Sequence, residues 1–139
     1  MAFNRGIAVV FVALSLAAQS GETFKARLSP VPADAKTRAD LAGSGSASAT
    51  LTGTKLAVTG SFDGLRSSAT TASLLGAIGP GVRGPVISDL TISKSTSGAI
   101  SGAIELTPQQ ITSLRKGGLY VQISSEKAPE GVLWGWLLK

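Results

Sequence analysis

Two serine–lysine pairs have a spacing that some acylating enzymes use, in which the lysine helps to deprotonate a nucleophilic serine. They are Ser113 with Lys116 and Ser124 with Lys127. The companion Ser-Asp-Asn and Lys-Thr-Gly motifs are absent from the chain. The second pair also falls in a predicted loop, which would hold a catalytic geometry poorly. We therefore expect no catalytic residue and no enzyme.

The chain contains few residues of the types that bind metals or cofactors. The chain contains no histidine, no cysteine and eight acidic residues, with no Asp-x-Asp run among them. The commonest imidazole and thiolate ligands are thereby missing. Gly79 to Gly84 matches the glycine spacing of a dinucleotide-binding loop, but Pro85 and an apolar strand follow it instead of a helix. We expect no metal site and no cofactor.

Three aromatic side chains are the best candidates for binding a partner: Tyr120, Trp134 and Trp136. Trp134 and Trp136 are two residues apart, so on a strand they share one face. If that face is exposed, the pair forms a platform for a sugar ring or a partner protein. If it faces inward, the pair is core. We expect at least one tryptophan in the core, because few other large side chains are available to fill it.

The elements that must position these residues are mostly strands. Short runs of Val, Ile, Leu and Thr alternate with Gly, Pro and Ser about every ten residues, which is typical of a sandwich or barrel. One helix is predicted over Pro108–Lys116, because Thr107 is an N-cap, Pro108 follows it and Gln110 completes a capping box. Ile111 and Leu114 would form its buried stripe. The strands are predicted at Thr23–Leu28 (an edge strand), Ser44–Thr52, Lys55–Phe62, Ala72–Leu75, Val86–Ser93, Ala99–Leu106, Tyr120–Ser124 and Val132–Leu138; a polar loop is predicted from Ser125 to Gly131.

Charge and the first residues bear on location. The 139-residue chain has a net charge of +5 with its basic residues spread along it, and its aromatic content is 5%. This disfavours nucleic-acid binding, although it permits a weak attraction to acidic polymers or anionic surfaces. Arg5 and the apolar run Ile7 to Ala17 indicate a signal peptide at residues 1–20. We expect one periplasmic or secreted domain over residues 21–139 with no membrane span after signal removal; a retained anchor is the alternative.

The order of segments resembles the CHRD domain, the module named from chordin and also found in exported bacterial proteins. The resemblance covers Thr23 to Leu138. It rests on Phe24 to Ser29, on Leu74 to Gly76 with Gly81 to Val86, and on three later stretches: Leu106 to Gln110, Gly118 to Ile123 and Glu130 to Leu137. It implies an antiparallel Greek-key-like β-sandwich with one short helix and an exported location, and it implies no reaction.

Many members of that family carry histidines in the middle and near the end of the domain. The resemblance places those histidines at Ser73, Leu75, Ser124 and Ala128 of this chain, none of which is histidine. Ser73 and Leu75 would share one strand face, so the family's pair could have bound a metal or formed a polar cluster there. A serine and a leucine cannot replace two imidazoles, so this chain either lacks the role of those histidines or fulfils it by another route.

Two functions follow from these expectations. The first is a non-catalytic exported interaction module, an accessory subunit with a protein partner in an envelope or extracellular assembly. The second is a carbohydrate or surface-polymer binding module that uses Trp134 and Trp136. In addition, the hydroxyl-rich strand Ser44–Thr52 is predicted to offer an edge that could pair with a partner strand.

Overall fold

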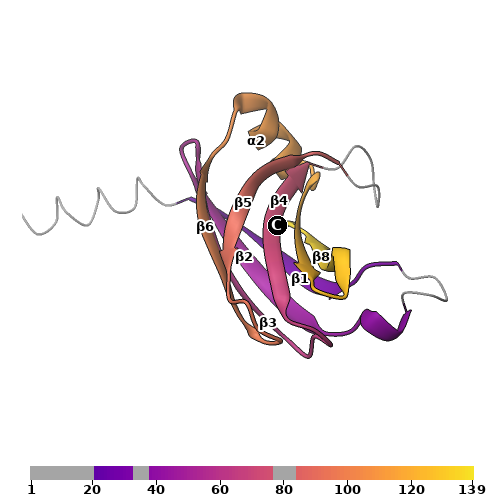
Figure 1. Cartoon of the computed structure of the whole chain (residues 1–139). Helices are drawn as coiled ribbons and strands as arrows, with labels where there is room; N and C mark the ends of the chain where they lie inside the picture. Colours follow the sequence, from indigo (N-terminus) through magenta and orange to yellow (C-terminus); the bar gives the residue numbers. More distant parts are fainter. Residues whose placement is uncertain (1–20, 33–37, 77–83) are drawn as a thin grey trace, which may run out of the picture.

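A computed structural model describes residues 21–32, 38–76 and 84–139. In these residues the chain forms eight antiparallel strands, one α-helix and one short 3-10 helix (Figure 1). The strands are β1 (Glu22–Pro30), β2 (Ser44–Thr52), β3 (Lys55–Asp63), β4 (Ala69–Gly76), β5 (Val86–Ile92), β6 (Gly98–Glu105), β7 (Leu119–Ser125) and β8 (Ala128–Trp136). The helices are η1 (Arg38–Asp40) and α2 (Pro108–Arg115).

The strands close into a barrel in the order β1-β2-β3-β6-β5-β4-β7-β8, and β8 returns to pair with β1. Two crossovers, from β3 to β4 and from β6 to β7, give the Greek-key connectivity. The seam between β1 and β8 consists of the pairs Ser29 with Trp134 and Pro30 with Leu133, together with a bridge between Lys25 and Leu138. The all-β antiparallel prediction is confirmed, whereas the predicted sandwich is a closed barrel.

Closure changes the role of two strands. The predicted edge strand β1 has neighbours on both sides, β2 and β8. The hydroxyl-rich strand β2 is likewise enclosed between β1 and β3, from Gly45 to Leu51. Full closure leaves neither backbone free to pair with a partner strand. The expectation that β1 is an edge strand and the expectation that β2 offers an edge to a partner strand are therefore both wrong.

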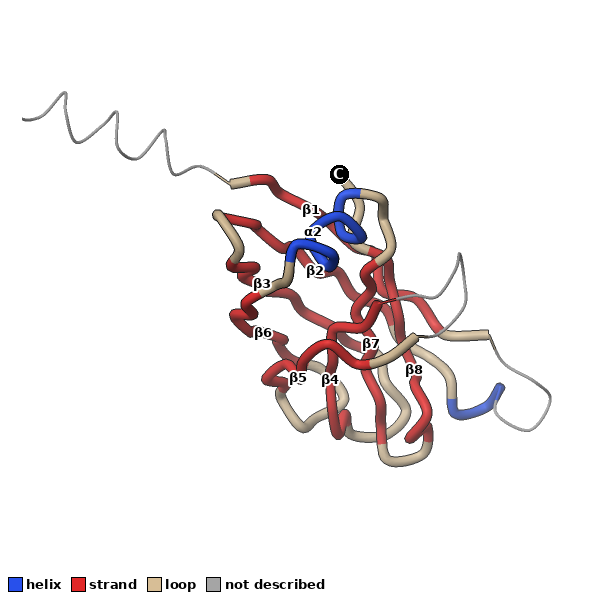
Figure 2. The backbone as a smooth tube through the Cα atoms, turned by 90° about the horizontal axis from the view of Figure 1, so that it is seen from above, coloured by secondary structure: helices blue, strands red, loops and turns tan. Residues whose placement is uncertain are grey.

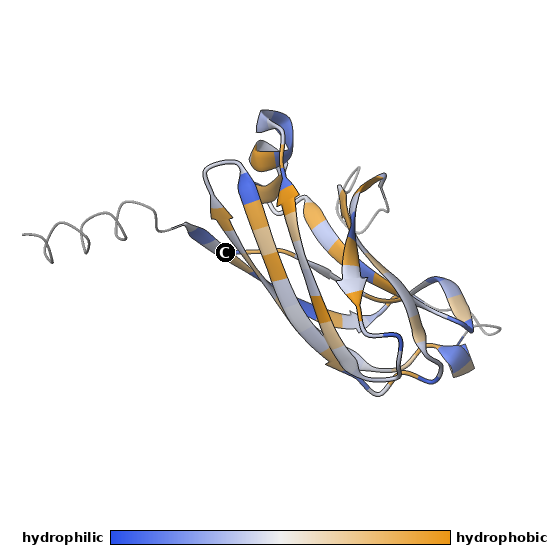
Figure 3. Ribbon diagram, turned by 60° about the vertical axis from the view of Figure 1, so that its left-hand side comes forward, coloured by the Kyte–Doolittle hydropathy of each residue, from blue (hydrophilic) through white to orange (hydrophobic). Residues whose placement is uncertain are grey.

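The barrel interior holds the core. Apolar and polar residues alternate along the strands (Figure 3), so that one face of each strand packs inward. Two phenylalanines supply the largest inward side chains, and aliphatic residues fill the rest. Among the most deeply buried are Phe24, Leu28, Leu56, Phe62, Leu74, Ile100, Val121, Ile123 and Leu133.

Helix α2 covers one end of the barrel (Figures 1 and 2). It begins as predicted. The backbone N–H of Gln110 donates to the Thr107 hydroxyl at 3.2 Å, and the backbone N–H of Thr107 donates to the side-chain oxygen of Gln110 at 2.9 Å. Leu114 is fully buried and Ile111 packs against the same core, which confirms the predicted stripe.

The strand positions agree with the expectations to within a few residues, with one exception. The predicted hairpin at Gly53-Thr54 joins β2, which has the expected bounds, and β3, which ends one residue later than expected, at Asp63. The loop predicted from Ser125 to Gly131 is wrong, because β8 already begins at Ala128. Gly131 has a φ of 127°, and the register between β7 and β8 shifts nearby. The start of β8 is therefore irregular, and its sequence has the polar composition and the glycine that are typical of a loop.

Candidate functional site

The three candidate aromatic residues meet on the outer surface of the barrel. Tyr120 on β7 is the register partner of Trp136 on β8, and Trp134 is the next outward residue of β8. We call these three side chains the aromatic cluster. The residues next to them along the two strands, such as Val121 and Leu133, point into the core. Two adjacent strands therefore build the aromatic cluster by simple alternation.

Tyr120 forms the base of the aromatic cluster. Its side chain is fully buried although it lies outside the barrel core. The backbone N–H of Gly84 donates a hydrogen bond to its hydroxyl at 3.0 Å. A buried phenol normally needs such a partner. Tyr120 therefore supports the tryptophans and holds the chain at Gly84, and its own ring is not exposed to solvent.

Trp134 and Trp136 are the partly exposed members of the aromatic cluster. Their ring centroids are 4.7 Å apart with an interplanar angle of 69°, while Trp136 stacks on Tyr120 at 4.9 Å and 25°. Trp134 meets Tyr120 edge-on at 5.9 Å. Each such ring pair contributes about 0.5–1.5 kcal/mol beyond its buried area. The expectation that one tryptophan fills the core is wrong, and the two rings do not form one flat platform.

The aromatic cluster continues as an apolar row across the neighbouring strands. Trp136 and Tyr120 are followed in register by Leu75 on β4 and Val86 on β5. Leu75 is buried, whereas Val86 is 57% exposed, the highest exposure among the large apolar side chains of the described residues. The row is thus covered in its middle and exposed at both ends.

Two of the four positions at which the resemblance places the family's histidines, Ser73 and Leu75, lie on this same outer surface. Ser73 and Leu75 share the outer face of β4, as expected, because Leu74 between them is core. The Ser73 hydroxyl donates to the Asp89 carboxylate at 3.3 Å. Ser124, which is paired with Thr71, is buried, and Ala128 at the start of β8 belongs to the hydrophobic core. Leu75 and the aromatic cluster thus give an apolar character to part of the surface where those imidazoles would stand.

One polar side chain lies next to Trp134. Gln122 is its register partner on β7, and the Gln122 amide nitrogen donates to the Glu130 carbonyl at 3.3 Å. The Gln122 Oε1 atom is buried and has no hydrogen-bond partner. Gly131 makes room for this amide, since a Cβ there would lie 3.0 Å from the Gln122 Cδ atom.

The serine–lysine pairs show no catalytic contact. In the described part of the chain, no side-chain hydrogen bond joins Ser113 to Lys116 or Ser124 to Lys127. Lys127 instead donates its backbone N–H to the Ser67 hydroxyl at 3.0 Å.

Within residues 21–32, 38–76 and 84–139, no group of three or more Asp or Glu side chains could hold a metal ion. The Gly79 to Gly84 motif falls almost wholly outside the described residues, as does the predicted signal peptide.

One ion-pair group joins the ends of the domain. Glu22, at the start of β1, contacts Arg115 of α2 at 2.6 Å and Lys139 at 2.9 Å. Hydrogen bonds from Arg115 and then from Lys139 lower the pKa of Glu22 to about 2, and the hydrogen bond between Glu22 and Arg115 raises the pKa of Arg115.

No helix in the described residues is long and apolar enough to cross a bilayer.

Comparison with known proteins gives one match. The sequence profile of the CHRD domain matches residues 24–137, almost the whole described barrel. The match favours a β-fold interaction domain of the kind found in extracellular proteins. No curated protein and no solved structure matches.

Proposed function

The chain belongs to the CHRD domain family, and we propose that it is a non-catalytic, exported interaction module that binds a protein partner as an accessory subunit of an envelope or extracellular assembly. The observation that carries the proposal is the aromatic cluster. Two partly exposed tryptophans are fixed on the outer surface by a fully buried tyrosine. Trp and Tyr dominate the residues that contribute most to protein–protein binding.

The aromatic cluster is already ordered before a partner arrives. Trp136 stacks on Tyr120, and Trp134 packs edge-on against both rings. Side chains that are held in place lose little conformational entropy on binding, which favours affinity. The exposed Val86 at the far end of the same row extends the apolar contact area beyond the two tryptophans.

The geometry favours a protein partner over a sugar at this position. Stacking on a pyranose ring needs an open aromatic face, and two coplanar rings would extend it. The 69° angle between Trp134 and Trp136 removes the coplanar platform, and Tyr120 is covered. Two tryptophan rings set at an angle to one another fit the irregular surface of a protein better than they fit a flat sugar ring.

Affinity capture from native envelope and extracellular fractions tests the proposal. The tagged domain, residues 21–139, is compared with the Trp136→Ala and Trp136→Phe variants, and the captured proteins are quantified by mass spectrometry. We expect a stoichiometric protein that is retained by the wild type and by Trp136→Phe, and lost with Trp136→Ala. Circular dichroism confirms that each variant is folded.

Two outcomes would contradict this function. In the first, no protein is enriched by the folded wild-type domain. In the second, bound glycans assayed in parallel are enriched in a Trp136-dependent manner without any protein, which would support the polymer-binding alternative instead.

A further inference from the structure

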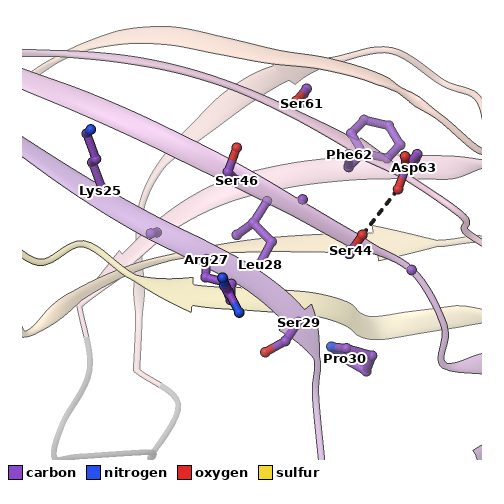
Figure 4. Close-up of a pocket in the computed structure, with 13 residues that line it drawn as sticks. Lys25, Arg27, Leu28, Ser29, Pro30, Ser44, Ser46, Ser61, Phe62 and Asp63 are labelled. Atoms are coloured by element: carbon purple, nitrogen blue, oxygen red, sulfur yellow. Dashed lines mark hydrogen bonds between the residues drawn. The ribbon is translucent and has the colours of Figure 1, made fainter.

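A second surface, separate from the aromatic cluster, lies over the outer face of β1, β2 and β3. An open groove of about 970 Å³ runs there, and a smaller hollow of about 390 Å³ adjoins it. The two share Lys25, Ala26 and Ser46, so they form one continuous furrow. Figure 4 draws the residues that line the larger part. We call this furrow the hydroxyl groove.

Strand register builds the hydroxyl groove from two parallel rows of outward side chains. Arg27, Ser46 and Ser61 form one row across β1, β2 and β3. Lys25, Ser48 and Thr59 form the next. Neighbouring side chains in a row are about 4.8 Å apart, and successive rows are about 7 Å apart. Each row therefore offers one cation followed by two hydroxyls.

The hydroxyl groove is hollow because its floor consists of short side chains while its β1 rim consists of long ones. Lys25 and Arg27 are exposed, and the salt bridges of the described residues involve neither of them. Asp63, at one end, is the one carboxylate in the lining, and it accepts a hydrogen bond from Ser44 at 3.2 Å. The rim is thus cationic and the floor is rich in hydroxyl donors and acceptors.

We propose that the hydroxyl groove binds an acidic polysaccharide chain. Lys25 and Arg27 would pair with its carboxylate or sulfate groups, because charge-assisted hydrogen bonds are the stronger ones. Ser46, Ser48, Thr59 and Ser61 would exchange hydrogen bonds with its ring hydroxyls. The repeat of a cation with two hydroxyls along the strand direction fits a polymer that repeats an acid group with hydroxyls.

Two other polyanions fit the hydroxyl groove less well. A nucleic acid would need aromatic side chains for base stacking, and the exposed lining has none. A membrane surface would need apolar side chains to insert beside the basic ones. The exposed side chains of the hydroxyl groove are serines, Pro30, Asp63, Lys25 and Arg27 in the larger part, with Thr59 in the smaller.

Binding of uronic-acid oligomers, measured by calorimetry at low and at physiological salt, tests this inference. The double variant Lys25→Gln with Arg27→Gln should bind at least about tenfold more weakly, because it removes both cations that would form charge-assisted hydrogen bonds with the acid groups. The matched control is Arg66→Gln with Lys94→Gln, which removes the same net charge from exposed positions outside the groove lining. Its affinity should stay close to that of the wild type.

A second variant separates shape from charge. Ser46→Phe fills the floor of the hydroxyl groove without changing the net charge, at an exposed strand position that tolerates an aromatic residue. We expect it to weaken uronic-acid binding to a similar extent. Neutral dextran should bind to none of these proteins.

Four results would overturn the inference. They are no binding by the wild type, equal weakening in the groove and control double variants, unchanged binding by Ser46→Phe, and equally tight groove-dependent binding of a single-stranded oligonucleotide or of phosphatidylglycerol vesicles. Because the hydroxyl groove and the aromatic cluster use different side chains, the Trp136→Ala variant should keep polysaccharide binding. Failure here therefore leaves the proposed protein interaction untouched.

Discussion

Tyr120 shows how one side chain connects the core, the surface and a neighbouring loop. Its ring supports both tryptophans, and its hydroxyl accepts the Gly84 N–H. Tyr120→Phe removes only that hydrogen bond, so we expect a loss of about 1 kcal/mol in the free energy of unfolding. Urea denaturation followed by tryptophan fluorescence measures it. No loss of stability would mean that Gly84 does not depend on this contact.

Residue types alone revealed the aromatic candidates but not their environment. Alternation correctly put Trp134 and Trp136 on one face and Ser73 with Leu75 on another. It could not tell which face was outward, because both faces of β7 and β8 carry large side chains. The buried Tyr120 hydroxyl accepts its hydrogen bond from Gly84, a residue 36 positions away in sequence. Local pattern carries no information on such a contact.

At the scale of the element, the capping box of α2 is a prediction from sequence that the structure confirms. Thr107→Ala removes the hydroxyl that accepts the Gln110 N–H. We expect a loss of about 1 kcal/mol in stability, the usual value for an N-cap. Thermal unfolding of the variant beside Thr112→Ala, a change inside the same helix, would measure it. A larger effect from Thr112→Ala would contradict this assignment.

The seam between β1 and β8 is the element that closes the barrel. A side chain at Gly135 would collide with the Arg27 carbonyl on β1. Gly135→Ala should therefore lower the free energy of unfolding by about 1–3 kcal/mol, the usual cost of overpacking. Gly76→Ala is the matched control, because a Cβ there meets only Ile87 and Leu119 side-chain atoms at 3.5 and 3.6 Å. Urea denaturation measures both variants. Equal free energies of unfolding would contradict the prediction, because they would mean that β1 and β8 can move apart at Gly135 without cost.

The closure of the barrel between β1 and β8 could not be predicted from the sequence. The hairpin of β2 and β3 follows from a short turn between two alternating runs. The pairing of Ser29 with Trp134 joins residues more than 100 positions apart, and no periodicity records it. For the same reason the hydroxyl groove was not foreseen. Its signal was the outward alternation of Lys25 and Arg27, which becomes a groove only after β2 and β3 are placed alongside.

For the whole molecule, Glu22 joins the start of β1 to α2 and to the C-terminus. Its pKa is about 2 in the folded state, against an ordinary value of 4.5. A carboxyl with a lowered pKa stabilises the fold above its ordinary pKa, and this contribution is lost as the pH falls from about 4.5 toward 2. Glu22→Gln should remove that part of the pH dependence.

Melting temperatures of the wild type and of Glu22→Gln between pH 7 and pH 2 measure this contribution. The gap between them should narrow as the pH falls below 4.5. The control is Glu126→Gln, an exposed carboxyl that takes part in none of the salt bridges of the described residues. A gap that stays constant down to pH 2 would contradict the lowered pKa.

The central claim is that the aromatic cluster faces a protein partner, and site-specific photo-crosslinking in the native envelope tests it most directly. A photoreactive residue placed at Leu138, which is 53% exposed and is the next outward position after Trp136, leaves the aromatic cluster intact. The control carries it at Ala103, an exposed position on β6. We predict a discrete crosslinked protein from position 138 and none from position 103. Crosslinks from neither position, or the same products from both, would contradict the claim.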